Sequence, residues 1–444
     1  MTLTRQAILT SALLFTIHAA VPALQRPTSR QAAPAHWIPT WTTAQQLVRF
    51  PVPAPASPPP ASSAPAPAPG LAPPLQTVRN QTLRMIARTS IGGRRVRVKL
   101  ANAFNGTRVE IGAARIALRD NVNGGLRPPR DSAIVTATDR ALTFGGAPSV
   151  KIAPGAVVVS DPVDLALPPL ADVAVSLYFP GETGPPTTHA RGLKTTYVST
   201  EGNHAASPAI PVAGTQLSYY WLAAIEVDAP PDARLIVAFG DSITDGSQST
   251  PDTNNAWPAI LAARLAAGKA TANIAVGNQG IGGNRVLSDG TLFQGVSALA
   301  RLDRDVLSQP GVAWLIVLEG INDIGNSTAG NGNTGPVTAE ELIRAHQQII
   351  DRAQQRGIKV MGATLTPYEG AAYFREEGET IRQAVNTWIR TSGAYDAVVD
   401  FDAVMRDPGN PRRLRAEFDP GDHLHPNDAG YRAMAEAIDL RLFR

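Results

Sequence analysis

The sequence predicts an α/β domain with a parallel sheet, preceded by an all-β domain of the sandwich or jelly-roll type. Its length of 444 residues exceeds that of one average domain and favours two. Residues 26–230 contain many short strand-like runs separated by Gly and Pro turns, which is typical of a sandwich. Residues 231–444 alternate short apolar strands with helical patterns. That alternation predicts a parallel sheet covered by helices on both faces.

The first 25 residues are typical of an export signal. Arg5 supplies a positive charge, residues 7–17 form a short apolar run, and small residues follow at Ala19, Ala20 and Ala23. The alternative is a buried N-terminal helix. The run is too short to span a membrane well. We therefore expect residues 1–25 to be a signal peptide and the mature protein to be exported, to the periplasm or the medium, without stable membrane insertion.

Composition excludes several classes of function. The chain is 43% hydrophobic and 17% charged, which is typical of a globular protein. A net charge of +3 is small for this length, so no nucleic-acid partner is expected. The chain has no cysteine, which excludes disulfides, thiolate metal sites and a cysteine nucleophile.

The β region begins with a strand-like piece at 35–44 that contains Trp37 and Trp41. Residues 51–74 are dense in Pro, Ala and Ser, and we interpret them as a surface loop of the β domain. Residues 95–100 alternate strictly between polar and apolar side chains, as in a half-buried strand. Other strand-like runs are 109–111, 114–118, 133–136, 150–152, 156–159, 171–179 and 221–227. The two tryptophans could stack on sugar rings, but packing in the core is favoured.

The second region contains five apolar runs that predict strands, at 235–239, 272–276, 312–318, 358–364 and 397–401. A helix is expected after the capping box Thr338-x-x-Glu341, and a last helix from about Asp428. The runs 312–318 and 397–401 are apolar throughout, as in strands that are buried on both faces.

Four polar or glycine-rich stretches lie at the carboxyl ends of these strands or in the last loop. They are 240–242 (Gly-Asp-Ser), 282–284 (Gly-Gly-Asn), 320–323 (Gly-Ile-Asn-Asp) and 422–425 (Asp-His-Leu-His). Ligands of open α/β sheets bind outside the carboxyl ends of the strands. The four stretches are therefore expected to form one cleft.

Ser242 is the candidate nucleophile in this cleft. A serine hydroxyl needs a base within reach. His425 is the favoured base, because Asp422 stands three residues before it and can orient its ring. The other candidates outside the signal are less suitable: His346 lies on the apolar face of a helix, and the remaining ones are His36, His189, His204 and His423. The first three of these lie in the β region and would have to reach across to the α/β half.

An attacked carbonyl also needs donors for the oxyanion. The candidates are the backbone N–H groups of Ser242 and Gly283 and the side-chain amide of Asn322, with Gly280 or Gly282 as substitutes for Gly283. The glycines at 280–283 could also suggest a phosphate loop. That reading is disfavoured, because no Lys-Ser/Thr pair follows and the loop comes after the second strand.

A metal site is the alternative reading of the last loop. Asp422, His423 and His425 could bind a metal, but no further His, Cys or carboxylate cluster clearly completes a site. No metal and no cofactor are therefore expected.

The four stretches together resemble the SGNH (GDSL) hydrolase superfamily over about residues 234–444. The resemblance implies that Ser242 is nucleophile and first oxyanion donor, that Gly283 and Asn322 are the other donors, and that Asp422 and His425 complete the triad. It also implies a three-layer α/β/α domain with a five-stranded parallel sheet.

The N-terminal half resembles exported bacterial GDSL proteins that carry a jelly-roll-like domain, through Trp37-x-x-x-Trp41 and the run 80–84 (Asn-Gln-Thr-Leu-Arg). Such relatives include carbohydrate O-acetyl esterases and proteins labelled lipase or lysophospholipase. We therefore expect an exported serine ester hydrolase that forms an acyl-serine. Its expected substrates are short-chain esters, with O-acetyl groups on carbohydrate as one candidate. The alternatives are a lipolytic esterase or lysophospholipase and a non-catalytic carbohydrate-binding protein.

Overall fold

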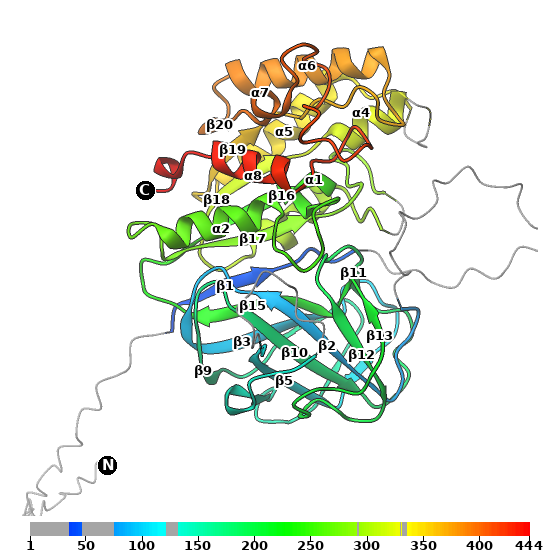
Figure 1. Ribbon diagram of the computed structural model, residues 1–444, viewed down its shortest axis with the longest axis vertical. Coiled ribbons are helices and arrows are strands. Elements are labelled where there is room, and N and C mark those ends of the chain that lie inside the picture. The colour runs from blue at the N-terminus through cyan, green and yellow to red at the C-terminus, as the bar shows by residue number, and fades with distance from the viewer. Residues whose placement is uncertain (1–34, 47–74, 121–131, 291–292, 329, 331–334) are drawn as a thin grey trace, which may run out of the picture. The chain divides into compact units, whose positions relative to one another are not determined.

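The computed structural model describes residues 35–46, 75–120, 132–290, 293–328, 330 and 335–444. The expected signal peptide and the Pro-rich segment 51–74 lie outside these residues. His36–Arg444 forms one compact unit, in which a β half is followed by an α/β half (Figure 1). The predicted domain boundary between residues 230 and 231 stays a prediction.

The β half contains two large antiparallel sheets and two small ones, as expected for a sandwich. The first sheet is β1 (Trp37–Thr42), β15 (Leu222–Asp228), β3 (Gly93–Ala101) and β8 (Val157–Val159), with β9 (Val163–Leu167) also paired to β3. The second is β13 (Val212–Gln216), β12 (Thr196–Glu201), β2 (Gln81–Arg88), β10 (Asp172–Phe179), β5 (Ala113–Leu118) and β6 (Arg140–Leu142). The small sheets are β4 (Val109–Ile111) with β7 (Val150–Ile152), and β11 (Thr188–His189) with β14 (Tyr219–Tyr220).

The alternation read from the sequence holds in β3. Val96, Val98 and Leu100 are fully buried, and they belong to the same apolar cluster as residues from the second sheet, such as Leu83. Strand β2 was not singled out from the sequence because almost all of its side chains are buried, so it has no period of two. The expected strand at 133–136 is wrong: a single bridge at Ile134 is followed by a 3₁₀ turn, η1 (Thr136–Thr138).

The α/β half has one five-stranded parallel sheet. In spatial order its strands are β17 (Ile274–Gly280), β16 (Arg234–Gly240), β18 (Val312–Leu318), β19 (Lys359–Ala363) and β20 (Ala397–Val399). The helices are α1 (Ser242–Asp245), α2 (Trp257–Ala267), α3 (Ala298–Leu302) with the π-turn η2 (Asp303–Leu307), α4 (Ile321–Thr328), α5 (Ala339–Gln354), α6 (Glu376–Thr391), α7 (Phe401–Met405), α8 (Asp428–Ala437) and the 3₁₀ turn η3 (Leu440–Phe443).

This sheet and its helices confirm the predicted α/β architecture. Helix α2 packs on α8 and β17, whereas α5 packs on α3, α6 and β19. The capping box that was read at Thr338 and Glu341 is present at the start of α5. The chain order of the strands reverses between β16 and β18. Such a switch point is where open α/β sheets bind ligands, and Ser242 and Asn322 follow these two strands.

Strand β17 differs from its prediction, because it starts later than expected and runs on to Gly280. The apolar run that predicted this strand ends at Val276, because Gly277, Asn278, Gln279 and Gly280 follow it. A side chain on Gly277 would lie 2.7 Å from Thr42 Oγ1, so this glycine allows β1 of the β half to pack on β17. In addition, Val276 N–H donates to Ser90 Oγ at 3.2 Å. The exposed edge of the parallel sheet is thereby covered by the β half.

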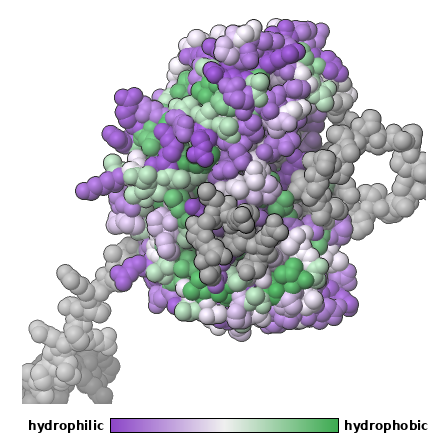
Figure 2. Space-filling model, viewed as in Figure 1, coloured by the Kyte–Doolittle hydropathy of each residue, from purple (hydrophilic) through white to green (hydrophobic). Residues whose placement is uncertain are grey.

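Hydrophilic residues cover much of the face shown in Figure 2, and hydrophobic residues are scattered among them in small groups. Scattered apolar residues on a surface need no partner to explain them. Within the part of the chain that the structure describes, no helix has the length and apolar character needed to cross a bilayer.

Candidate active site

Ser242 lies on a sharp turn between β16 and the short helix α1. Asp241 caps this helix, and its Oδ1 accepts the N–H of Ile243 at 2.8 Å. A side chain on Gly240 would lie 2.1 Å from Thr244 Oγ1 and 2.6 Å from Leu318 O, so only glycine fits before the turn. The strand therefore ends in a turn that is fixed by backbone sterics and places Ser242 as the first residue of α1.

The structure brings Ser242, His425 and Asp422 together, although 183 residues separate the serine from the histidine. The Ser242 hydroxyl lies 2.8 Å from His425 Nε2. On the other side of the ring, His425 Nδ1 lies 2.7 Å from Asp422 Oδ2. This is the geometry in which a base accepts the serine proton while a carboxylate holds the ring.

Asp422 is held in place by more than the histidine. Its Oδ1 accepts the backbone N–H groups of Leu424 and His425, and its Oδ2 accepts Gln248 Nε2 at 3.0 Å. Burial raises the pKa of Asp422, but the hydrogen bonds and charge of His425 outweigh burial and hold the pKa well below its usual range. Asp422 is therefore a stable carboxylate. Gln248 was not identified from the sequence.

Two backbone N–H groups at the cleft are available to an oxyanion. Within the described ranges, the N–H groups of Ser242 and Gly283 have no hydrogen-bond partner. Gly283 has φ +77, and a side chain there would lie 2.7 Å from Gln294 Cγ, so the position requires glycine. The N–H of Gly280 donates to Asn278 Oδ1 at 2.8 Å. That bond removes Gly280 from the candidate donors and leaves Gly282 and Gly283.

Asn322, the third candidate donor, is buried on the first turn of α4. Its Nδ2 donates to Asn284 O at 3.1 Å, and its Oδ1 accepts the hydroxyl of Tyr373 at 3.2 Å. The tyrosine bond fixes which way the amide faces, and the second N–H of Nδ2 remains available. Tyr373 fits against Gly325, where a side chain would lie 2.3 Å from its ring. Tyr373 is a positioning residue that the sequence did not reveal.

The loop after Gly283 is held against α4 by Asp323. Its carboxylate accepts the backbone N–H groups of Val286 and Leu287 at 2.8 and 2.9 Å. Burial raises the pKa of Asp323 to about 6, although these two bonds lower it. A cavity of about 520 Å³ lies beside this loop, and both charged and apolar residues line it, among them Arg285, Arg344, Leu287, Leu299 and Val337.

The buried side chain of Arg301 forms hydrogen bonds to the ends of the three strands that carry Ser242, Gly283 and Asn322. It is fully buried, and its guanidinium donates to five acceptors, at 2.7–3.2 Å: Gly240 O, Gln279 O, Asn284 Oδ1, Asp305 Oδ2 and Glu319 Oε1. Its carbon Cζ also lies 4.0 Å from the centre of the Phe239 ring. Four of these acceptors lie at strand ends of the cleft. Gly240 lies shortly before Ser242, Gln279 and Asn284 lie on either side of Gly283, and Glu319 directly precedes Gly320. One side chain therefore fixes the spacing of the three strand ends.

Two buried acids lie close to Arg301. Burial, with repulsion from Asp241 and Asp323, raises the pKa of Glu319 well above its usual range. Burial, with repulsion from Asp323 and Asp245, raises the pKa of Asp241 to about 7. Arg301 opposes both shifts.

The other histidines of the described residues do not contact the Ser242 hydroxyl. As expected, His346 is buried in the core, with its ring nitrogens 2.6 Å from Tyr395 Oη and 3.2 Å from Glu319 O. His423 pairs with Asp419 at 2.5 Å. His36 and His204 face backbone carbonyls of Ala233 and Glu201. Among the residues described, no group of three or more His, Cys, Asp or Glu side chains has the geometry of a metal site.

His189 reaches from the β half to the α/β half, although its ring contacts Asp245 and not Ser242. Strand β11 carries it to α1, where Nε2 lies 2.9 Å from Asp245 Oδ1 and Nδ1 lies 2.9 Å from Ala44 O. Burial alone would lower the pKa of His189, but the Asp245 carboxylate outweighs burial and raises it. The β half is therefore bonded directly to the helix that begins with Ser242.

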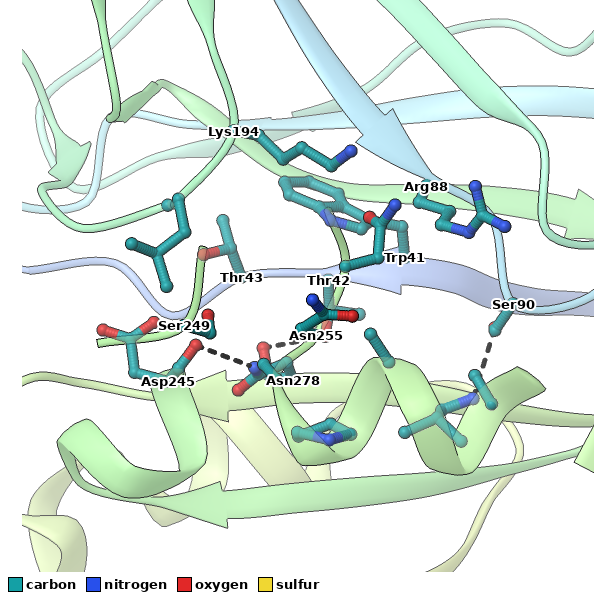
Figure 3. Close-up of a pocket in the computed structure, with 18 of the residues that line it drawn as sticks. Trp41, Thr42, Thr43, Arg88, Ser90, Lys194, Asp245, Ser249, Asn255 and Asn278 are labelled. Atoms are coloured by element: carbon teal, nitrogen blue, oxygen red, sulfur yellow. Dashed lines mark hydrogen bonds between the residues drawn. The ribbon is translucent and has the colours of Figure 1, made fainter. Parts of the chain in front are cut away.

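A cavity of about 120 Å³ lies beside this contact, where the β half meets α1 and α2. Figure 3 shows Trp41 and Lys194 on the side of the β half, opposite Asp245 and Asn278. Trp41 packs edge-on against Tyr219, with ring centres 4.7 Å apart. Trp41 is thus packed against the core, as the sequence favoured.

Comparison with known proteins agrees with this fold. Residues 236–438 match the family model described as GDSL-like Lipase/Acylhydrolase. A search of the curated proteins found no match.

Similar solved structures include the following three. The first is a putative lipolytic protein of the G-D-S-L family from Desulfitobacterium hafniense, 22% identical, with a TM-score of 0.35, covering 46% of this chain and 96% of that one. The second is an acetyl xylan esterase that is 22% identical, with a TM-score of 0.35. The match covers 46% of this chain and 96% of that one. The third is a carbohydrate acetylesterase from Sinorhizobium meliloti that is 14% identical, with a TM-score of 0.37. The match covers 47% of this chain and 98% of that one.

Proposed function

We propose that the protein is an exported serine esterase acting on short-chain esters. The match of residues 236–438 to the family model described as GDSL-like Lipase/Acylhydrolase supports the esterase activity. The observation that carries the catalytic proposal is the contact of Ser242 Oγ with His425 Nε2 at 2.8 Å, backed by Asp422 at 2.7 Å. The export step of the proposal depends on the sequence of residues 1–25.

In the proposed reaction His425 Nε2 accepts the proton of Ser242 as Oγ attacks the ester carbonyl. The negative charge that develops on the carbonyl oxygen is bound by the N–H groups of Ser242 and Gly283 and by Asn322 Nδ2. His425 then returns the proton to the departing alkoxide, which leaves an acyl group on Ser242. Water activated by the same imidazole hydrolyses this acyl-serine, and Asp422 stabilises the charged ring in both steps.

The proposed substrates are esters of small acids, with O-acetyl groups on carbohydrate as the leading candidate. Support for short acyl groups comes from the sequence, where residues 234–444 contain no long apolar insertion that could cap the cleft. A long acyl chain gains binding energy from apolar walls, at about 0.8 kcal/mol for each buried methylene. The lipolytic alternative predicts that gain, and the short-chain proposal does not.

A series of 4-nitrophenyl esters of increasing acyl length tests this choice. We expect kcat/KM to be greatest for acetate or propionate and to fall as the chain lengthens, because no gain from apolar burial offsets the added bulk. Initial rates with purified protein provide the measurement. An optimum at about eight carbons or longer would mean that the protein buries a long acyl chain against apolar residues. That result would favour the lipolytic alternative.

Asn322→Ala is expected to lower kcat by about 10²- to 10³-fold, the usual cost of losing one oxyanion donor. KM should change much less, because the donor acts on charge that forms only in the transition state. Asn326→Ala is the matched control: its amide bonds Asn322 O at 2.8 Å one turn further along α4. A fall of similar size in both variants would show that α4 had been disturbed and would speak against a specific donor.

The non-catalytic alternative makes a separate prediction. A carbohydrate-binding protein that only retains the fold would bind glycans without turnover and would not react with a fluorophosphonate probe. The free N–H groups and the Ser242–His425 contact support a reactive serine instead.

A further inference from the structure

The β half places an arginine beside the loop that carries the proposed oxyanion donor. A side chain built on Gly282 would lie 3.5 Å from Arg191 Cδ and 3.9 Å from both Nε and Nη1. Arg191 therefore lies against the residue that precedes Gly283. It follows His189, whose ring contacts α1, so the same short segment reaches both the nucleophile helix and the oxyanion loop.

Arg191 is half-buried and carries a charge that nothing nearby neutralises. Over the described ranges it makes no hydrogen bond or ion pair. The carboxylates of the cleft are engaged elsewhere: Asp422 with His425, Asp323 with two backbone N–H groups and Glu319 with Arg301. A partly desolvated guanidinium without a counter-charge is costly, which favours an external anion as its partner.

The segment around Arg191 is held rigidly. Gln46 Oε1 accepts Ala190 N–H at 2.7 Å, and Ser218 Oγ donates to Ala190 O at 2.8 Å. On the other side, Leu193 O accepts Asp252 N–H at 2.8 Å. Gly192 lies so close to the Tyr219 ring that a side chain there would be 2.5 Å from it. A cation on such a fixed support can bind a ligand without a large loss of conformational entropy.

We propose that Arg191 is a specificity residue that binds a carboxylate on the leaving group of the substrate, and that the enzyme prefers acetyl esters of acidic molecules such as uronate-containing carbohydrate. This inference rests on the proposed function of the same site. The planar guanidinium matches a carboxylate in two parallel hydrogen bonds. Without such a cation, an anionic substrate would be repelled as the oxyanion forms next to it.

The test uses two acetate esters that differ in one charge, 4-acetoxybenzoate and its methyl ester. In Arg191→Gln we expect kcat/KM for the carboxylate to fall by about tenfold more than kcat/KM for the methyl ester, as for loss of a charged hydrogen bond. For each ester we compare kcat/KM of the variant with kcat/KM of the wild type, so the intrinsic reactivity of the ester cancels. Arg191→Lys keeps the positive charge but cannot form the two parallel hydrogen bonds of a guanidinium. It should therefore keep part of the preference for the carboxylate ester. Added salt should weaken the wild-type preference.

Arg94→Gln is the matched control. Arg94 is an exposed cation on β3 that likewise has no partner among the described residues. Its removal should change the ratio by no more than about twofold, as is usual for a surface position.

An equal fall for both esters in Arg191→Gln, or no fall, would overturn this inference alone. Failure of the wild type to hydrolyse the neutral methyl ester in a Ser242-dependent way would overturn the proposed function, and the inference with it.

Discussion

Ser242→Ala is expected to lower kcat/KM on 4-nitrophenyl acetate by about 10⁴-fold or more. The hydroxyl is the proposed nucleophile, and within the described residues His425 is the one histidine that contacts it. The loss should appear in kcat, because removing one oxygen leaves the shape of the cleft intact. Steady-state rates with purified protein, together with a thermal melt to show that the variant is folded, provide the measurement.

Ser247→Ala is the control for this experiment. Ser247 lies just after α1, and its Oγ is buried without a hydrogen-bond partner among the described residues. Its removal should leave kcat/KM within about threefold of the wild type, since no bond is lost. Activity of Ser242→Ala close to that of Ser247→Ala would mean that another group performs the attack.

Arg301→Met is expected to have the second largest effect, a loss of about 3–5 kcal/mol in the free energy of unfolding. Methionine fills much of the space but removes the donor to Asn284 Oδ1 and the cation beside Glu319. Because Arg301 bonds the residues that flank Gly283 and precede Ser242, kcat should fall together with stability. Urea unfolding and kinetics on the same preparation measure both quantities.

Arg301→Lys separates charge from geometry. Lysine keeps the positive charge but cannot reach the five acceptors in the plane of a guanidinium, so it should recover part of the stability and little of kcat. Arg352→Met is the matched control, because Arg352 forms a partly exposed pair with Asp303 at 2.7 Å. Such pairs contribute about 0–1 kcal/mol. Similar stability of the Arg301 and Arg352 variants would show that the buried network is not what holds the strand ends.

Much of the α/β half could be predicted because each special stretch directly follows an apolar strand. Parallel strands end at one edge, so Ser242, Gly283 and Asn322 were expected to meet there, and the structure places them at that edge. The positive φ of Gly283 explains why glycine stands at that position. Asp422 and His425 could be paired from their spacing, because a carboxylate three residues before an imidazole reaches its ring within one loop.

The side chains that hold these groups in place could not be predicted. Arg301, Tyr373 and Gln248 lie on a helix or in loops with no periodic or local signal for their roles. Their partners are distant in the sequence: Tyr373 bonds Asn322, and Gln248 bonds Asp422. Tertiary packing alone selects these contacts.

The contact of the β half with helix α1 could not be predicted for a related reason. An all-β pattern does not show which of its loops faces a neighbouring sheet. Strand β11, which delivers His189 to α1, has only two residues and therefore no pattern of its own. Gly277, which lets β1 approach β17, also interrupts the apolar run from which the end of β17 could have been predicted.

The central claim is that the acyl group of the substrate is transferred to Ser242. Mass spectrometry of protein quenched in acid during turnover of 4-nitrophenyl acetate tests this claim directly. We expect an acetyl adduct on the peptide that contains Ser242, present only while substrate remains and absent from Ser242→Ala. Turnover at full rate with no covalent adduct, or with the adduct on another residue, would contradict the claim.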